Sequence, residues 1–251
     1  MHGEVPGTTL WVCSGLYFGW MVLDNMDGKQ ARRLNCSSPL GLLFDHQVDA
    51  INVWMTASLV STAMLYGDSP VTLLLWLIGA IPFFYTTWEE LFIGSMDFPC
   101  VNGPNEGCLV IGGLLMYTAY AGSEAFVEGK WVGWEVRSVL IAGFLLASVV
   151  NGLWSIGRVW FKLNYRAAAL RSSLAFWPYP LTLAVLYLLS PGLLLWTQTR
   201  WVLICIGCLF AREMAFIQLA HVTETNYRPL GLVNGGIMAA LVLNTLGNYL
   251  E

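Results

Sequence analysis

The chain has 251 residues and a formal net charge of −4, with 57% hydrophobic and only 11% charged residues. Soluble domains carry about 25% charged residues, and the mean hydropathy of this chain is +0.61. The composition therefore argues against a soluble globular protein, and the few scattered basic residues argue against nucleic-acid binding.

Apolar runs recur along the whole chain, and a bilayer crossing needs about 20 such residues. The twelve tryptophans and ten tyrosines fall largely near the ends of these runs, as interfacial aromatic residues do. We predict an all-α, polytopic transmembrane helical bundle that forms a single membrane domain over residues 1–251. About eight membrane segments are expected, roughly at 8–24, 41–66, 69–95, 108–122, 133–158, 173–190, 192–221 and 229–248.

The end of the first segment and the start of the second carry four aspartates. Asp24 and Asp27 are three residues apart, and Asp45 and Asp49 are four apart, so each pair shares one face of its helix. Four carboxylates brought together repel one another unless a divalent cation neutralises them. The spacing therefore predicts a Mg²⁺ or Mn²⁺ site held by these four side chains.

Small and basic residues accompany the aspartates. Gly28 leaves out a side chain where a ligand can approach the backbone, and Ala31 and Gly41 keep the facing helix surfaces open. Arg32 supplies a forked donor suited to phosphate. Taken singly, the glycines have an alternative as packing residues and Arg32 as a topology anchor. Taken together, they predict a metal-bound diphosphate with substrate contacts from Gly28, Lys29, Ala31, Arg32 and Gly41.

The remaining segments hold fewer candidate residues. Glu89 is expected to meet a cationic head group, with neighbouring aromatic rings adding a cation–π contact; the alternative is a solvated residue at a helix end. Cys205 and Cys208 have a C-x2-C spacing, but no second pair of ligands accompanies them, so we expect free thiols and no zinc site.

The distribution of Lys and Arg predicts the orientation. If the loop after the first segment is cytoplasmic, the loops on that side carry most of the basic residues, including Lys29, Arg32 and Arg33. This asymmetry satisfies the positive-inside rule. The carboxylates are therefore expected to open toward the cytosol.

The chain resembles the CDP-alcohol phosphatidyltransferase family in one pattern, which matches the family signature without a gap or mismatch. The pattern is Asp24-x2-Asp27-Gly28-x2-Ala31-Arg32-x8-Gly41-x3-Asp45-x3-Asp49. The flanking residues are similar to the eukaryotic cholinephosphotransferase and ethanolaminephosphotransferase branch. This second similarity lies in residues 27–33, 38–41, 44–46, 87–89, 102–107 and 219–223.

The resemblance implies the transfer of phosphocholine or phosphoethanolamine from CDP-choline or CDP-ethanolamine to diacylglycerol, with release of CMP. Asp49 would be the general base that takes the proton of the acceptor hydroxyl. His46 is the rival base, because imidazole exchanges protons near neutral pH, but it points about 100° away from the metal face and ranks second. The resemblance also implies an endoplasmic reticulum or Golgi membrane, with a homodimer as one option for assembly.

Two other functions remain open at this point. One is a phosphatidyltransferase that uses a CDP-diacylglycerol donor and a polyol acceptor such as inositol. The other is a non-catalytic membrane protein whose acidic cluster binds or conducts cations. Members of the resembling branch usually have a longer chain on both sides of this region, so a divergent short form or a truncated product is expected.

Overall fold

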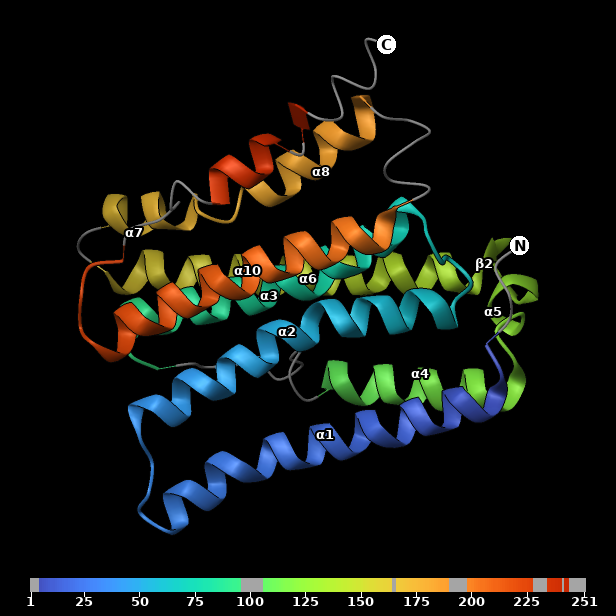
Figure 1. The fold of residues 1–251 in the computed structure, drawn as a ribbon, viewed down its shortest axis with the longest axis horizontal. Coiled ribbons are helices and arrows are strands. Elements are labelled where there is room, and N and C mark those ends of the chain that lie inside the picture. The colour runs from blue at the N-terminus through green and yellow to red at the C-terminus, as the bar shows by residue number, and fades with distance from the viewer. Residues whose placement is uncertain are drawn as a thin grey trace.

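The computed structural model describes residues 5–95, 106–163, 166–189, 198–227, 234–240 and 242–243, and helices make up nearly all of it (Figure 1). The long helices are α1 (Gly7–Arg33), α2 (Pro39–Ala63), α3 (Pro70–Ile93), α6 (Val136–Lys162) and α10 (Thr199–Val222). The shorter elements are α4 (Cys108–Ala121), α5 (Ala125–Glu128), β1 (Lys130–Trp131), β2 (Trp134–Glu135), α7 (Arg166–Ser173) and α8 (Pro178–Leu189). The predicted helical membrane bundle is confirmed.

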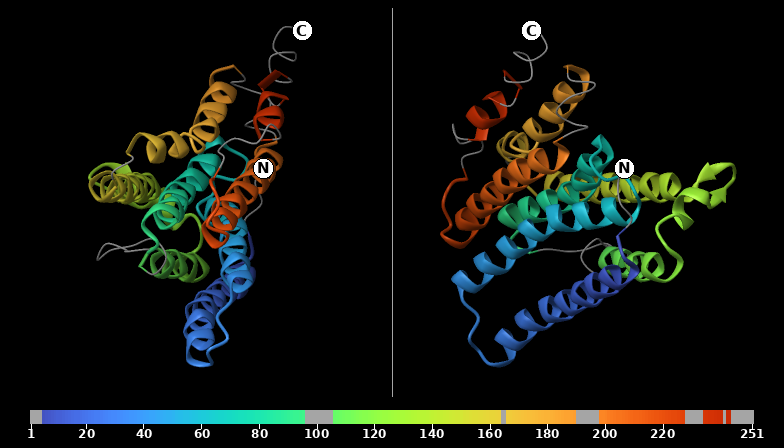
Figure 2. Two further views of the ribbon diagram at one scale, coloured as in Figure 1. Left: turned by 90° about the vertical axis from the view of Figure 1, so that its left-hand side faces the viewer. Right: turned by 45° about the vertical axis from the view of Figure 1, so that its right-hand side comes forward.

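Helix α3 lies at the centre of the bundle and packs against α2, α6 and α10 (Figure 2). Helix α1 lies at the edge, and its main packing partner is α4 rather than α2. Gly112 of α4 makes this contact close, because a Cβ atom there would lie 2.6 Å from the ring of Phe18. The end of α1 that carries the aspartates is therefore joined to the rest of the bundle by few backbone contacts.

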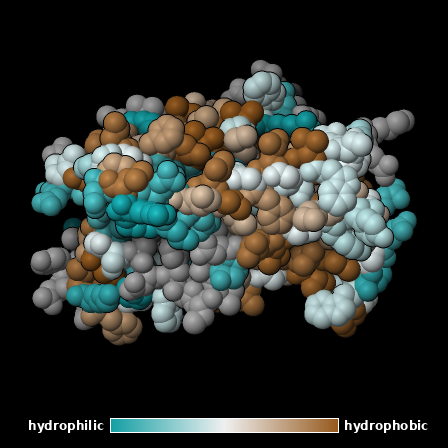
Figure 3. All heavy atoms as spheres, turned by 90° about the horizontal axis from the view of Figure 1, so that it is seen from below, coloured by the Kyte–Doolittle hydropathy of each residue, from teal (hydrophilic) through white to brown (hydrophobic). Residues whose placement is uncertain are grey.

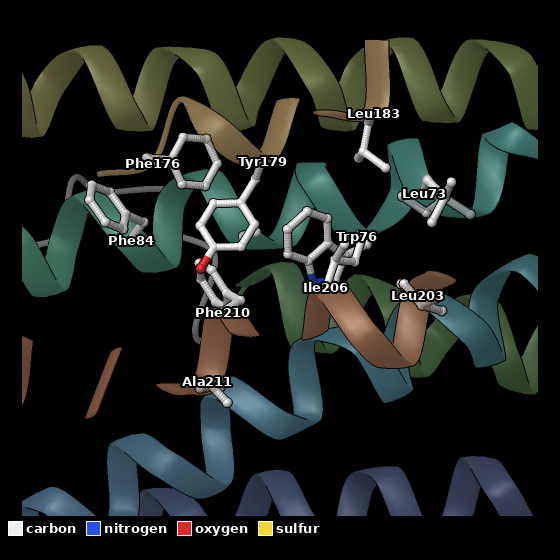
Figure 4. Packing of buried hydrophobic residues seen from close by; sticks show 14 of the residues in the cluster. Leu73, Trp76, Phe84, Phe176, Tyr179, Leu183, Leu203, Ile206, Phe210 and Ala211 are labelled. Atoms are coloured by element: carbon white, nitrogen blue, oxygen red, sulfur yellow. The ribbon is translucent and has the colours of Figure 1, made fainter. Parts of the chain in front are cut away.

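The core is built on one face of α3. Trp76, Phe84 and Trp88 are spaced by multiples of four, so they share a helix face, and none of them is exposed. The ring of Trp76 lies 5.8 Å from that of Tyr179 and 5.6 Å from that of Phe210, which brings α8 and α10 onto α3 (Figure 4). Tilted and edge-to-face ring pairs at these distances stabilise a core beyond their buried area.

In the part of the chain that the structure describes, three helices are long and apolar enough to cross a membrane: α3, α6 and α10. Helices α1 and α2 are of similar length, but they carry the carboxylates. Seen from below in Figure 3, hydrophilic residues gather at the left-hand end and hydrophobic ones cover much of the rest. The predicted number of about eight segments stays a prediction.

The structure corrects several predicted boundaries. Helix α1 continues to Arg33, nine residues beyond the predicted segment 8–24, because no proline interrupts it and a glycine inside a helix, such as Gly28, is tolerated at modest cost. The predicted segment 173–190 begins five residues too early, since α7 ends at Ser173 and α8 begins only at Pro178.

A hairpin stands where the predicted segment 133–158 was expected to begin. Its central residues are Val132 and Gly133, not the Asn-Gly pair that marks such turns, so no turn signature in the sequence predicts this hairpin. The predicted segment 229–248 is described only at 234–240 and 242–243, and both stretches are helical. Of the motif at 102–107, positions 102–105 lie outside the described residues.

Gly207 of α10 allows the closest packing of α10 on α2. A Cβ atom at this position would lie 2.6 Å from Cδ1 and 2.9 Å from Cβ of Trp54. Gly207→Ala is therefore expected to lower the free energy of unfolding by about 1–3 kcal/mol through overpacking, measured by thermal unfolding in detergent. The matched control is Gly143→Ala on α6, where a Cβ atom meets nothing within 4 Å and the higher helix propensity of alanine should be neutral or stabilising. Equal stability of the two variants would contradict this account of the packing.

Candidate metal centre

Three carboxylates from two helices converge at one place. Asp24 comes from α1, and Asp45 and Asp49 come from successive turns of α2; each offers one oxygen, and these three oxygens lie within 4.8 Å of one another. The predicted face-sharing of Asp45 and Asp49 is therefore observed. Asp24 meets them because α1 and α2 run antiparallel on either side of the loop at 34–38 (Figure 1).

The three carboxylates fit a divalent cation. Oxygens of Asp24 and Asp49 lie within 4.8 Å of each other, which two carboxylates tolerate only with a shared proton or a cation close to both. Oδ1 of Asp49 is buried and has no hydrogen-bond partner among the described residues, whereas buried polar atoms are normally paired. An all-oxygen set of this kind is the type that Mg²⁺ or Mn²⁺ prefers.

The fourth predicted ligand, Asp27, lies outside this group of three. Its carboxylate accepts the backbone N–H of Gly28, so the side chain is turned toward its own helix. It is exposed and lines the same groove as Asp24. Its role as a metal ligand stays a prediction.

The groove beside the carboxylates has a volume of about 580 Å³. Asp24, Asp27 and Asp45 supply its acidic part. Its other lining residues are mostly apolar and come from both helices and the loop between them: Trp20, Leu23, Met26, Gln30, Ala31, Leu34, Cys36, Phe44 and Val48. The groove therefore joins a cation-binding end to an apolar wall that suits a lipid.

The predicted substrate-binding residues take different places around this groove. Ala31 lines it. A Cβ atom at Gly28 would lie 3.4 Å from Nη1 of Arg32, so the guanidinium lies against the surface that Gly28 leaves open. Lys29 is exposed on the same helix and is not among the lining residues.

Gly41 has a local role in starting α2. Its N–H donates to Oγ of Ser38 at 3.1 Å, which caps the helix, and Pro39 occupies the first helical position, where the missing N–H costs nothing. The Ser38-Pro39 pair thus fixes where α2 begins and with it the direction of its aspartate face.

Consecutive residues of α2 face three different helices. Asp45 faces α1. His46 lies 3.8 Å from Oε2 of Glu90 on α3. The amide of Gln47, oriented to suit both partners, donates to the carbonyl of Ala211 at 3.0 Å and accepts from the N–H of Ala215 at 2.9 Å on α10. Because His46 contacts α3 and Gln47 contacts α10, the rotation of α2 is fixed, and its face with Asp45 and Asp49 is directed toward α1.

His46 lies between the carboxylates and a second polar cluster. It is close enough to Asp24 and Asp45 to interact with both electrostatically, and its Nδ1 lies 3.1 Å from the carbonyl of Leu42. On its other side is Glu90, which accepts a hydrogen bond from Gln218 at 3.0 Å and lies 4.0 Å from Nε2 of His221.

Glu90 was not among the predicted site residues. The signal that points to it is its position at the end of an apolar segment, because ionisable residues inside a membrane protein usually face the bundle interior and mark function. Its pairing with His46 depends on how α2 and α3 pack, which the sequence does not reveal.

Glu89, the predicted contact for the head group, is placed elsewhere. Its carboxylate forms an ion pair with Arg158 of α6 at 2.5 Å, and its side chain is only 1% exposed. Glu89 does not line the groove. The structure thus gives it a partner between α3 and α6, and its contact with a substrate stays a prediction.

Comparison with known proteins connects this arrangement to a family. Residues 7–98 match the model of the CDP-alcohol phosphatidyltransferase family. The chain is 32% identical to choline/ethanolaminephosphotransferase 1 of Arabidopsis thaliana, over 91% of the chain and 62% of that protein. It is also 32% identical to cholinephosphotransferase 1 of Gallus gallus, over 53% of the chain and 40% of that protein.

A further similarity is to CDP-diacylglycerol–serine O-phosphatidyltransferase of Encephalitozoon cuniculi, at 33% identity over 44% of the chain and 29% of that protein. The chain spans 62% of the length of both Arabidopsis thaliana relatives that it matches. The matched region of the family model contains all four aspartates and His46.

Proposed function

The chain belongs to the CDP-alcohol phosphatidyltransferase family, and from this we propose that it transfers phosphocholine or phosphoethanolamine from the CDP-alcohol to diacylglycerol and releases CMP. The observation that carries the proposal is the convergence of Asp24, Asp45 and Asp49 beside a groove with apolar walls. The names of the Arabidopsis thaliana and Gallus gallus relatives support the choice of choline and ethanolamine.

Three aspartates would hold the cation. We assign Asp24, Asp45 and Asp49 to this role because their oxygens already lie within 4.8 Å of one another. A bound Mg²⁺ or Mn²⁺ supplies charge neutralisation for the diphosphate and orients it. Arg32, beside Gly28, adds a bidentate donor to a phosphate at the same end of α1.

The acceptor fits the rest of the groove. Trp20, Leu23 and Met26 on α1 face Phe44 and Val48 on α2 across it, and apolar side chains of this kind can pack against acyl chains. The hydroxyl of diacylglycerol would then reach the acidic end. There its oxygen bonds to the phosphorus next to the choline or ethanolamine, and the bond from that phosphorus to CMP breaks.

The proton of that hydroxyl needs an acceptor, and the structure offers two. A carboxylate that holds a cation is a poor proton acceptor, which weighs against Asp49. A general base is commonly oriented by a third group. Here the carbonyl of Leu42 lies 3.1 Å from Nδ1 of His46, and Glu90 lies 3.8 Å from its Nε2. We therefore place His46 first as the base, with Glu90 as its positioning residue.

The orientation in the membrane is proposed from the ends of the helices. Basic residues follow the carboxylates at the end of α1, which has Arg32 and Arg33 in its last turn, and Lys162 ends α6. Helices α1 and α6 end at the same side of the bundle (Figure 1). By the positive-inside rule this side faces the cytosol, and an endoplasmic reticulum or Golgi membrane would house the protein.

One assay separates the proposed function from its alternatives. Purified protein in nanodiscs is given CDP-choline or CDP-ethanolamine, with and without diacylglycerol and Mg²⁺, and labelled CMP release is measured. We expect release only when donor, diacylglycerol and Mg²⁺ are all present, and its loss with excess EDTA.

Two other outcomes would redirect the assignment. CMP release that occurs only with CDP-diacylglycerol as donor and serine or inositol as acceptor would favour a phosphatidyltransferase. The Encephalitozoon cuniculi relative supports this alternative function. No CMP release with any donor, together with Mg²⁺ binding, would favour a non-catalytic cation-binding protein.

A further inference from the structure

The hairpin of β1 and β2 projects from one end of the bundle (Figure 2). Trp131, Val132 and Trp134 are 63%, 84% and 71% exposed. Solvent-facing hairpin turns are normally made of Asn, Asp, Gly or Ser. A tip with three large apolar side chains is therefore unusual for a surface that meets only water.

The backbone of this tip is unfavourable for its sequence. Val132 has φ of 51° and Gly133 has φ of 82°, so both lie in the left-handed region. Glycine adopts this region readily, but a β-branched residue rarely does. If position 132 faced water, asparagine would suit it better than valine, because asparagine tolerates the left-handed backbone and is polar. An apolar surrounding explains why valine is found there.

The base of the hairpin is polar and firmly attached. Glu135 pairs with Lys130 at 3.8 Å and with Arg137 at 2.7 Å, and the Arg137 guanidinium holds the pKa of Glu135 below its usual range. Arg137 also donates to the carbonyl of Met64 at the end of α2 at 3.2 Å and lies over the ring of Tyr66 at 4.6 Å. All charges of the base are thus paired, and the tip is directed away from the bundle.

The position of the hairpin indicates what surrounds the tip. Helix α6 begins at Val136, directly after β2, and is one of the helices apolar and long enough to cross a membrane. Residues 131–135 therefore lie at the end of a membrane span, where Trp and Tyr collect at the lipid–water boundary.

Other exposed aromatic residues lie at the same end of the bundle. Tyr117 and Tyr120, near the end of α4, are 51% and 84% exposed, and Trp11, near the start of α1, is 46% exposed. The two helix ends are adjacent, because a Cβ atom at Gly7 would lie 3.3 Å from the carbonyl of Ala119. The aromatic residues thus form a belt on several elements rather than one isolated tip.

We propose that residues 131–134 are an interfacial anchor, which inserts Trp131, Val132 and Trp134 into the boundary between head groups and acyl chains of one leaflet. This leaflet lies at the opposite end of the bundle from the carboxylates, since Asp24 is about 25 Å along α1 from its start. Through Arg137 and Met64 the anchor is tied to α2, which carries Asp45 and Asp49. The anchor therefore sets the depth of the helix that bears two of the three converging aspartates.

Spin-label accessibility tests the anchor without reference to catalysis. All cysteines are first replaced by serine, Val132→Cys is labelled with a nitroxide, and the full chain is placed in phosphatidylcholine nanodiscs. We expect the label to collide more with oxygen, which concentrates in the bilayer, than with a water-soluble nickel complex. The control is Asn35→Cys, an exposed loop residue that also has a left-handed backbone, with φ of 53°, where the nickel complex should dominate.

The outcomes are distinct. A label at 132 that favours the nickel complex as strongly as the label at 35 overturns the anchor. Changing Trp131 and Trp134 to serine should shift the label at 132 toward the values of the control, and no shift would show that the tryptophans do not hold the tip in lipid. If the Val132→Cys protein fails to fold, the label at Trp131→Cys gives the same reading.

Discussion

Asp49→Asn is expected to lower CMP release roughly 10²–10⁴-fold, because a bound cation stabilises phosphoryl transfer by several kcal/mol and Asp49 provides one of the three oxygens that converge among the described residues. The measurement is the rate of CMP release in nanodiscs, first at the Mg²⁺ concentration that saturates the wild type and then at higher concentrations. Raising the Mg²⁺ concentration should recover part of the activity, since the remaining two carboxylates still attract the ion.

A stability measurement separates loss of the site from loss of the fold. Without a cation, Asp24, Asp45 and Asp49 repel one another, so removing one charge relieves this repulsion. We therefore expect Asp49→Asn to unfold in EDTA at a temperature equal to or above that of the wild type. In Mg²⁺ the wild type should gain more thermal stability than the variant, because a ligand that binds only the folded state stabilises it.

The matched control is Asp68→Asn. Asp68 lies between α2 and α3 and pairs with Arg200 at 3.2 Å, outside the groove. This variant has the same chemical change and should retain the activity and the Mg²⁺ response of the wild type. Full activity of Asp49→Asn, or equal losses in the two variants, would contradict the metal assignment.

His46→Asn is expected to lower kcat roughly 10²–10⁴-fold, the usual contribution of a general base, while nucleotide binding is kept. We expect turnover to fall without a loss of nucleotide binding, because His46 is directed toward Glu90 and is not one of the converging metal ligands. Turnover is measured as CMP release, and binding as the Mg²⁺-dependent affinity for CDP-choline.

Glu90→Gln tests the positioning role in the same assay. Glutamine keeps the size of the side chain and its ability to accept from Gln218, but it removes the negative charge beside His46. We expect a smaller loss of kcat than for His46→Asn with the KM for CDP-choline unchanged, whereas a purely structural role would change both. The control is Glu124→Gln, at an exposed residue before α5.

If His46→Asn binds nucleotide poorly yet turns over normally when saturated, the proton acceptor is another residue, with Asp49 as the first alternative.

The ranking of the two bases shows where sequence reasoning ends. The family resemblance indicates Asp49 as the base, and helical geometry places His46 about 100° away from the metal face. The direction of His46 is as the helix predicts. What changed its standing is Glu90, which lies 44 positions along the chain and reaches His46 only through the packing of α3 on α2.

Glu89 and Gly41 show the same limit. A glutamate at the end of an apolar segment suggests a contact with a cationic head group, yet its neighbour in space is Arg158, supplied by the packing of α6 on α3. Gly41 is predicted to keep the facing helix surface open, and its observed contact is a cap with Ser38. Glu89 and Glu90 are adjacent in sequence, and only the tertiary structure directs Glu89 to α6 and Glu90 to α2.

The sequence by itself determined the helical membrane class, the two helices that carry the acidic residues, and the sharing of one face by Asp45 and Asp49. These follow from composition and from the 3.6-residue repeat, which are local properties of the chain. Only the tertiary structure decided that Asp24, and not Asp27, closes the group of three, that His46 meets Glu90, and that the tip at 131–134 stands free. Each of these depends on the distance and rotation between helices, which are set by side chains far apart in the sequence, such as Gly207 against Trp54.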